Sequence, residues 1–168
     1  IDPAYGTMDD FQALMADCEE RNIKVILDLV VNHSGYDHVW FQEAANYLKA
    51  LPKDQEPDAA VCPYVDYYTF SREKGSGMRV LNGTDWYYEA MFSHDMPDLN
   101  LDNPAVRQEI EKIMKFWMDK GVAGFRLDAA KEFFSGRVNK NVEVLSWLQK
   151  AAVSIDPDAY MVAEVWEG

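Results

Sequence analysis

The stretch Gly124-Phe125-Arg126-Leu127-Asp128 predicts a short β-strand that carries charge on one side. Phe125 and Leu127 alternate with Arg126 and Asp128, and side chains two residues apart on a strand point the same way. Arg126 and Asp128 therefore share one face. The guanidinium favours the ionised form of the Asp128 carboxyl, and an ionised, oriented aspartate at a strand end suits a nucleophile. A purely structural ion pair is the alternative interpretation.

Composition and charge limit the class of protein. The chain has 168 residues, enough for one medium-sized domain, and 48% of them are hydrophobic. Its formal net charge of −13 argues against nucleic acid and against an anionic membrane surface as partners, whereas a neutral, polar substrate is compatible with it. The two cysteines, Cys18 and Cys62, form neither a disulfide framework nor a CxxC metal motif. No apolar run approaches the roughly 20 residues of a membrane span.

Regular elements alternate along the chain on either side of one irregular stretch. The pattern predicts helices over 7–22, 102–121 and 138–153, and strands over 24–31, 124–128 and 160–166. Such alternation predicts an α/β fold with a parallel sheet. The almost wholly apolar run 24–31 favours a strand that is buried on both faces. We therefore divide the chain into 1–35, an inserted irregular subdomain over 36–100 that includes one helix near 39–51, and 101–168.

Polar side chains lie on or just after all three predicted strands. In chain order they are Asp28, Asn32 and His33, then Arg126 and Asp128, then Glu164. Ligands of parallel α/β folds bind at the carboxyl ends of strands, so these groups are expected to gather in one site. The apolar sequence neighbours of Glu164 favour a raised pKa, while Arg126 favours an ionised Asp128. Such a pair suggests the acid and the nucleophile of glycoside hydrolysis. Asp28, inside its strand, is interpreted as structural rather than catalytic.

Four ordered motifs resemble the signature regions of the α-amylase family of glycoside hydrolases, also called family 13. They are DLVVNH at 28–33, MPDLN at 96–100, GFRLD at 124–128 and EVW at 164–166. The stretch IDPAYGT at 1–7 is also similar to that family. The resemblance implies a partial (β/α)8 TIM barrel, of which the chain supplies strands three to five, with 36–100 as the inserted domain B. It also implies that the chain is a fragment of a catalytic domain and is inactive alone.

The resemblance further implies a role for individual residues. Asp128 would be the nucleophile, Glu164 the general acid/base, and Arg126 the residue that orients Asp128. Three residues are assigned to substrate binding, namely His33, which would contact the sugar being cleaved, Lys131 and Tyr5.

A structural calcium ion is also implied by the resemblance. Asn32 and Asp98 match positions that bind Ca²⁺ in many members, and amide and carboxylate oxygens suit that ion. One departure concerns this site, because a histidine that is common four residues after the nucleophile is replaced by Glu132.

The function implied is that of a retaining hydrolase of α-1,4-glucosidic bonds in starch-like glucans or maltooligosaccharides. Ala129, Lys131 and the ending 164–168 resemble α-amylases more than oligo-1,6-glucosidases. An α-glucosidase or a glucan transferase of the same family is the first alternative. A non-catalytic relative that serves as a binding or transporter subunit is the second, and a metal-dependent hydrolase using Asn32, His33 and Asp128 is the third. An extracellular location is compatible with the resemblance alone.

Overall fold

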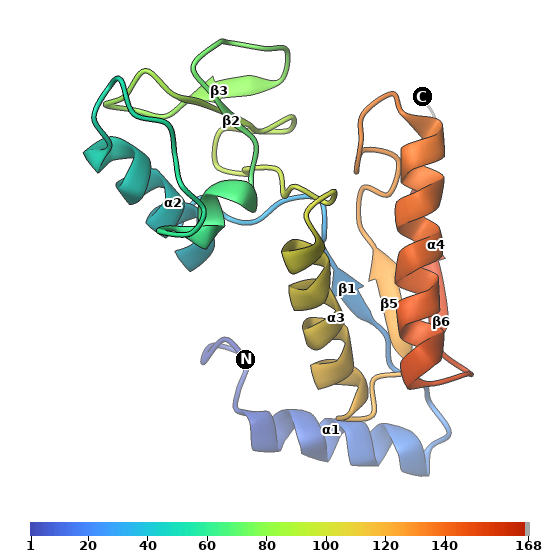
Figure 1. The fold of residues 1–168 in the computed structure, drawn as a ribbon. Coiled ribbons are helices and arrows are strands. Elements are labelled where there is room, and N and C mark those ends of the chain that lie inside the picture. Colours follow the sequence, from blue (N-terminus) through green and yellow to red (C-terminus); the bar gives the residue numbers. More distant parts are fainter. Residues whose placement is uncertain (167–168) are drawn as a thin grey trace. The chain divides into compact units, whose positions relative to one another are not determined.

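Figure 1 shows the computed structural model of the chain, in which residues 1–166 are described. The chain divides into two compact units. The sheet unit comprises Ile1–Leu29 and Glu109–Gly168, and the inserted unit comprises Val30–Gln108. The predicted domain boundaries after residues 35 and 100 stay a prediction. The last two residues of the α-amylase-like ending, Glu167 and Gly168, lie outside the described residues.

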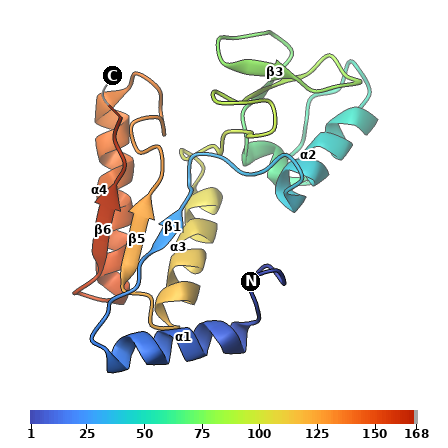
Figure 2. The ribbon, with the colours of Figure 1, turned by 180° about the vertical axis from the view of Figure 1, so that it is seen from behind.

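The sheet unit is built on a parallel sheet, as the alternation of elements predicted. β1 (Leu27–Leu29), β5 (Gly124–Leu127) and β6 (Tyr160–Ala163) lie in the order β1-β5-β6. The helices are α1 (Met8–Glu20), most of α3 (Pro104–Met118) and α4 (Val138–Ile155). Figures 1 and 2 show α3 and α4 along one face of the sheet, and the reverse view looks onto the other face without a helix in front of it.

One face of the sheet is therefore the core, and the other carries the polar groups. Phe125 and Leu127 on β5 are buried, and so are Val144 and Leu148 on α4. The strand over 24–31 was predicted to be buried on both faces, and this prediction is wrong. Asp28 is exposed because its side of the sheet has no second layer within the described residues.

The helix ends follow the local sequence signals. Asp10 and Thr7 form a capping box before α1, because the Asp10 amide donates to Thr7 Oγ1 at 3.2 Å and the Thr7 amide donates to Asp10 Oδ2 at 2.7 Å. Asn22, with φ of +55°, and Gly121, with φ of +95°, take left-handed conformations soon after α1 and α3 end. These predicted stop signals are confirmed.

The inserted unit has more regular structure than its sequence suggested. α2 (Val39–Ala50) and the short 3₁₀ helix η1 (Pro63–Asp66) accompany an antiparallel sheet of β2 (Phe70–Ser71), β4 (Tyr87–Glu89) and β3 (Met78–Val80). Its core is aromatic, since the Phe41 ring centroid lies 5.1 Å from that of Tyr68 and 4.9 Å from that of Tyr88. Strands of two or three residues give too short an alternation to be recognised in the sequence.

Within residues 1–166, no helix has both the length and the apolar character needed to cross a bilayer.

At Gly124 the backbone of β5 lies so close to that of β6 that no side chain fits between them. Its φ is +151°, and a Cβ built there would lie 1.7 Å from the Tyr160 carbonyl oxygen. We predict that Gly124→Ala lowers the melting temperature strongly, because the clash adds to backbone strain of about 1–3 kcal/mol. Gly136→Ala is the matched control, since Gly136 also has a positive φ, of +74°, but has nothing within 4 Å of the added Cβ. Equal destabilisation by both variants would contradict the close-approach argument.

Candidate active site

Strand register brings four charged side chains to one face of the sheet unit. Asp28 on β1 is in register with Arg126 on β5, which is in register with Val162 on β6. Residues in register on parallel strands point to the same face, and so do residues two apart. Asp128 and Glu164, two positions after Arg126 and Val162, therefore join the same face just beyond the strand ends.

A single guanidinium contacts all three carboxylates. Nη1 of Arg126 donates to both carboxylate oxygens of Asp28 at 2.9 Å and to Oδ1 of Asp128 at 3.1 Å. Nη2 lies 2.7 Å from Oε2 of Glu164. The predicted pairing of Arg126 with Asp128 is present, and Asp28 and Glu164 are partners that the sequence did not reveal.

The contacts within this cluster shift the pKa values of Arg126 and Glu164. Hydrogen bonds to Asp28 and to Glu164 raise the pKa of Arg126 further above its ordinary value, so the guanidinium stays charged. Partial burial acts to raise the pKa of Glu164. Hydrogen bonds from the Trp166 side chain and from Arg126, together with the charge of Arg126, outweigh burial, and the pKa of Glu164 is lowered overall.

The predicted rise in the pKa of Glu164 is therefore wrong. The prediction relied on apolar sequence neighbours, but residues next to each other on a strand point to opposite faces. Val165 is 54% exposed and Trp166 is 75% exposed, so they build no apolar pocket around the carboxyl. The groups that meet the Glu164 carboxyl are Arg126, from the neighbouring strand, and the Trp166 side chain, which donates a hydrogen bond.

The backbone after β5 fixes both carboxylate-bearing residues. Glu164 N donates to Leu127 O at 2.9 Å, and Ala130 N donates to Glu164 O at 3.1 Å, so parallel pairing continues past the strand ends. Between them Ala129, with φ of +48°, takes a left-handed conformation that is uncommon for alanine. Such outliers concentrate at functional sites, which supports this edge of the sheet as the active one.

A buried polar residue that the sequence analysis missed holds the loop after Asp128. Asn141 on α4 is 7% exposed; its Nδ2 donates to Lys131 O, and its Oδ1 accepts from Phe134 N at 2.8 Å. Lys131 Nζ in turn donates to Trp166 O at 3.3 Å. The signal was present in the sequence, because Asn141 occupies a core position three residues before Val144 on the apolar face of the helix.

Within the sheet unit, Tyr5 is an assigned residue that the structure does not bring to the cluster. It is 88% exposed in the segment before α1, and no contact joins its side chain to Arg126 or the three carboxylates within the described part of the chain.

The remaining assigned residues lie together in the inserted unit. His33 and Asp98 form an isolated antiparallel bridge, and Asn32 Nδ2 donates to Asp98 Oδ1 at 3.3 Å. The ring centroid of His33 lies 5.7 Å from that of Phe92. Burial raises the pKa of Asp98 to about 6 and outweighs a hydrogen bond from the Met91 amide.

The donor chemistry of Asn32 and Asp98 fits a calcium ion, although the pair alone does not complete a site. Burial disfavours the negative charge of the Asp98 carboxylate, and a bound cation would offset this cost. Ca²⁺ takes about 6–8 oxygen ligands. The nitrogen of the Asn32 amide faces Asp98. The amide would have to rotate for its oxygen to bind the same ion as Asp98. Within residues 1–166, no group of three or more His, Cys, Asp or Glu side chains is placed to hold a metal.

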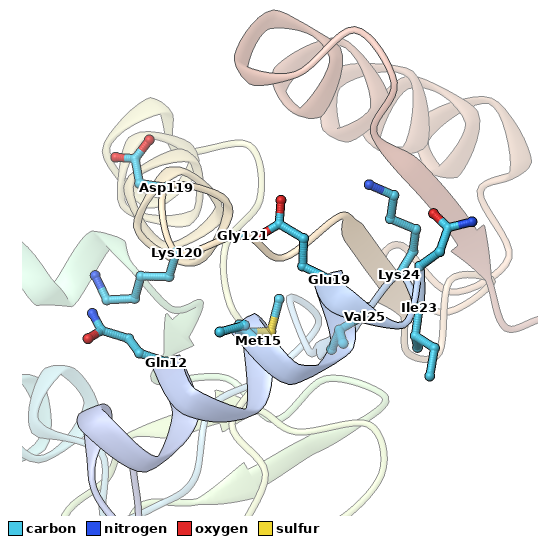
Figure 3. Close-up of a pocket in the computed structure, with 11 residues that line it drawn as sticks. Gln12, Met15, Glu19, Ile23, Lys24, Val25, Asp119, Lys120 and Gly121 are labelled. Atoms are coloured by element: carbon cyan, nitrogen blue, oxygen red, sulfur yellow. The ribbon is translucent and has the colours of Figure 1, made fainter.

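A hollow of about 750 Å³ lies elsewhere in the sheet unit (Figure 3). It is lined by α1 residues such as Met15 and Glu19, by Lys24 before β1, and by Lys120 and Gly121 before β5. It therefore lies at the amino ends of the strands, opposite the carboxylate cluster. Since substrates of parallel α/β folds bind at the carboxyl ends, we assign no catalytic role to this hollow.

Two carboxylates and an arginine at the carboxyl edge of a parallel sheet are compatible with glycoside hydrolysis, which uses a pair of carboxyl groups. The family model described as alpha amylase, catalytic domain, matches residues 1–168. The chain belongs to this family, and the predicted resemblance is confirmed.

Individual relatives agree with this family. Alpha-amylase 3 of Dictyoglomus thermophilum is 45% identical over 170 residues, which cover 99% of this chain and 31% of the relative. Trehalose-6-phosphate hydrolase of Escherichia coli is 42% identical over 135 residues, which cover 76% of this chain and 23% of the relative. The solved structure of Eubacterium rectale Amy13B matches with a TM-score of 0.97 and 50% identity, over 99% of this chain and 32% of that protein. The chain thus spans about a third of the length of the relatives that match all of it.

Asn141 supports a prediction about the loop that carries Lys131. We expect Asn141→Leu to destabilise the protein by roughly 1–3 kcal/mol for each of the two backbone groups that lose their partner. Leucine is apolar and of similar size, so packing on α4 is kept. Asn139→Leu is the matched control, because Asn139 is exposed on the same helix. Denaturant unfolding measures both, and an undisturbed Asn141→Leu variant would show that the loop is held by other contacts.

Proposed function

We propose that the protein carrying this chain is a retaining glycoside hydrolase that cleaves α-1,4-glucosidic bonds in starch-like glucans or maltooligosaccharides. The observation that carries the proposal is the shared contact of Asp128 and Glu164 with Arg126 on one face of a parallel sheet. We further propose that β1, β5 and β6 are the third, fourth and fifth strands of a (β/α)8 barrel. The inserted unit would then be the family's domain B.

Each carboxylate has a separate task in this proposal. Asp128, held by Arg126 at 3.1 Å, attacks the anomeric carbon and forms a covalent glucosyl–enzyme. Glu164 first protonates the leaving oxygen and then takes a proton from the water that releases the sugar. The contact with Arg126 keeps Glu164 ionised in the structure, which is the form needed for the second step. The first step needs the protonated form, so kcat/KM should fall as pH rises through the pKa of Glu164.

Three residues are proposed to bind substrate: His33, Lys131 and Tyr5. The bridge to Asp98 fixes the backbone of His33, and the Asn141 contact fixes that of Lys131. These supports suit residues that must meet a sugar in a defined position. The Tyr5 amide donates to Asp2 O at 2.9 Å, but its side chain is exposed, so its role rests on the family resemblance.

An α-glucosidase that attacks short substrates is the second candidate function. Relatives of 38–42% identity include trehalose-6-phosphate hydrolase, glucan 1,6-alpha-glucosidase and oligo-1,6-glucosidase. Those matches cover 74–76% of this chain, whereas the match to Alpha-amylase 3 covers 99%. The α-amylase-like function is favoured because Alpha-amylase 3 is also more similar in sequence, at 45% identity. Release of maltooligosaccharides from starch would support it, and exclusive release of glucose from isomaltose would support the α-glucosidase.

Substitution of the two carboxylates tests the assignment of roles. We predict that Asp128→Asn and Glu164→Gln each lower starch hydrolysis by about a thousandfold or more. With α-glucosyl fluoride, whose leaving group needs no protonation, Glu164→Gln should still form the covalent intermediate and accumulate it. Asp128→Asn should form none, because the nucleophile is absent. Intact-mass measurement after mixing detects the adduct.

The matched control is Asp119→Asn, which removes a carboxylate on the α3 side that pairs with Lys115 at 2.7 Å. It should hydrolyse starch normally. An adduct on Asp128→Asn would reverse the two roles. Full starch hydrolysis by either carboxylate variant would place the active site elsewhere.

Calcium is proposed as a structural ion only, held in part by Asn32 and Asp98. When bound, it would supply a positive charge to the partly buried Asp98 carboxylate. Because a ligand stabilises only the state that binds it, we predict that EDTA lowers the melting temperature and that added Ca²⁺ restores it. Asp98→Asn should melt at the same temperature with and without EDTA. An unchanged melting temperature of the unaltered protein in EDTA would contradict a structural role for calcium.

A further inference from the structure

Asp28 is the partner that takes the largest share of the Arg126 hydrogen-bonding capacity. Both of its oxygens accept from Nη1 at 2.9 Å, closer than the 3.1 Å between Nη1 and Asp128. It lies on β1, directly in register with Arg126. A residue needed only for strand pairing would not have to present a carboxylate to the group that holds the nucleophile.

We propose that Asp28 is a positioning residue of the catalytic site, which anchors Nη1 of Arg126 and limits the attraction that Arg126 exerts on Glu164. The proposal rests on the proposed role of Glu164 as general acid/base. Asp28 itself touches no reacting atom, so it acts through Arg126.

Asp28 can orient Arg126 because the guanidinium is planar. Its nitrogens diverge in a fixed fork, so fixing one of them orients the others. Asp28 holds Nη1 from the β1 side, which leaves Nη2 directed toward Glu164 at the far side of the same face. Without Asp28, the carboxylates left to hold the side chain among residues 1–166 are Asp128 and Glu164, and both change their charge or bonding during the proposed reaction.

Asp28 also acts through its negative charge. The facing charged groups are Asp28 from β1, Asp128 after β5 and Glu164 after β6. Lys131 adds a positive charge nearby, since its ammonium donates to the carbonyl of Trp166. Removing the negative charge of Asp28 ends its repulsion of the Glu164 carboxylate. The positive charge of Arg126 is then shared by two carboxylates instead of three. Both effects favour the ionised form of Glu164.

Loss of the Asp28 charge moves the pH dependence of kcat/KM in one direction. Glu164 must carry its proton in the first step, so the alkaline limb of kcat/KM reports the loss of that proton. A change that favours the ionised carboxylate moves this limb to lower pH. We therefore expect Asp28→Asn to shift the alkaline limb to lower pH by about half a unit or more. We also expect kcat to fall about tenfold, because Arg126 is less well placed.

The experiment measures kcat/KM against pH for a chromogenic maltooligosaccharide, with melting temperatures recorded in parallel. Asp28→Asn keeps the size of the side chain and removes its charge. Asp28→Glu keeps the charge and displaces it by one methylene, so it should restore the alkaline limb but not kcat. Asp119→Asn removes an equal charge at the opposite end of the sheet unit and should leave the profile unchanged. A merely structural Asp28 would lower the melting temperature without moving the limb.

The outcomes separate this inference from the proposed function. An alkaline limb of Asp28→Asn that stays in place, or that moves to higher pH, overturns the role of Asp28. The proposed function fails instead if the unaltered protein does not hydrolyse the substrate, or if Glu164→Gln retains the alkaline limb. If Asp28→Asn does not fold, Asp28→Glu decides the matter. An alkaline limb of Asp28→Glu that moves away from that of the unaltered protein would show that the charge of residue 28 does not set its position, and would overturn the role of Asp28.

Discussion

One positive charge shared by three carboxylates is the constraint on which the rest of this site depends. Asp28, Asp128 and Glu164 come from three different strands or strand ends and meet at Arg126. Carboxylates gathered so closely repel one another. Arg126 offsets that repulsion, and its own pKa is raised by the hydrogen bonds it makes in return. The site can therefore keep several acidic groups on one open face of the sheet.

The fold supplies this arrangement through strand register rather than through a pocket. A slip of one residue would turn Arg126 or Glu164 to the apolar face. Gly124 allows β5 to approach Tyr160 closely at the start of the β5–β6 pairing, and the hydrogen bonds of Glu164 continue the pairing at its end. The buried side chains of Phe125 and Leu127 hold the opposite face. Packing on one face thus determines which side chains meet on the other.

The sequence was sufficient to predict features that depend on neighbours along the chain. The caps of α1, the parallel sheet and the shared face of Arg126 and Asp128 follow from local patterns. The direction of the Glu164 pKa shift could not be predicted, because it depends on hydrogen bonds from the Trp166 side chain and from Arg126, which lies on another strand. The same is true of Asp28, whose interpretation as structural did not include Arg126. The two- and three-residue strands of the inserted unit carry too little periodicity to be read from sequence.

The shared charge also suits the two-step chemistry proposed for the site. In the first step Asp128 carries its negative charge, and together with Asp28 it limits how strongly Arg126 favours the ionised form of Glu164. Once Asp128 is bonded to the sugar, it loses its negative charge, and Arg126 is left with Asp28 and Glu164. The ionised form of Glu164 is then favoured more strongly, and that is the form needed to accept a proton from water. One fixed guanidinium can thus favour the ionised form of Glu164 weakly in the first step, when Glu164 must be protonated, and strongly in the second, when it must be ionised. This requires that Asp28 keeps Arg126 in place.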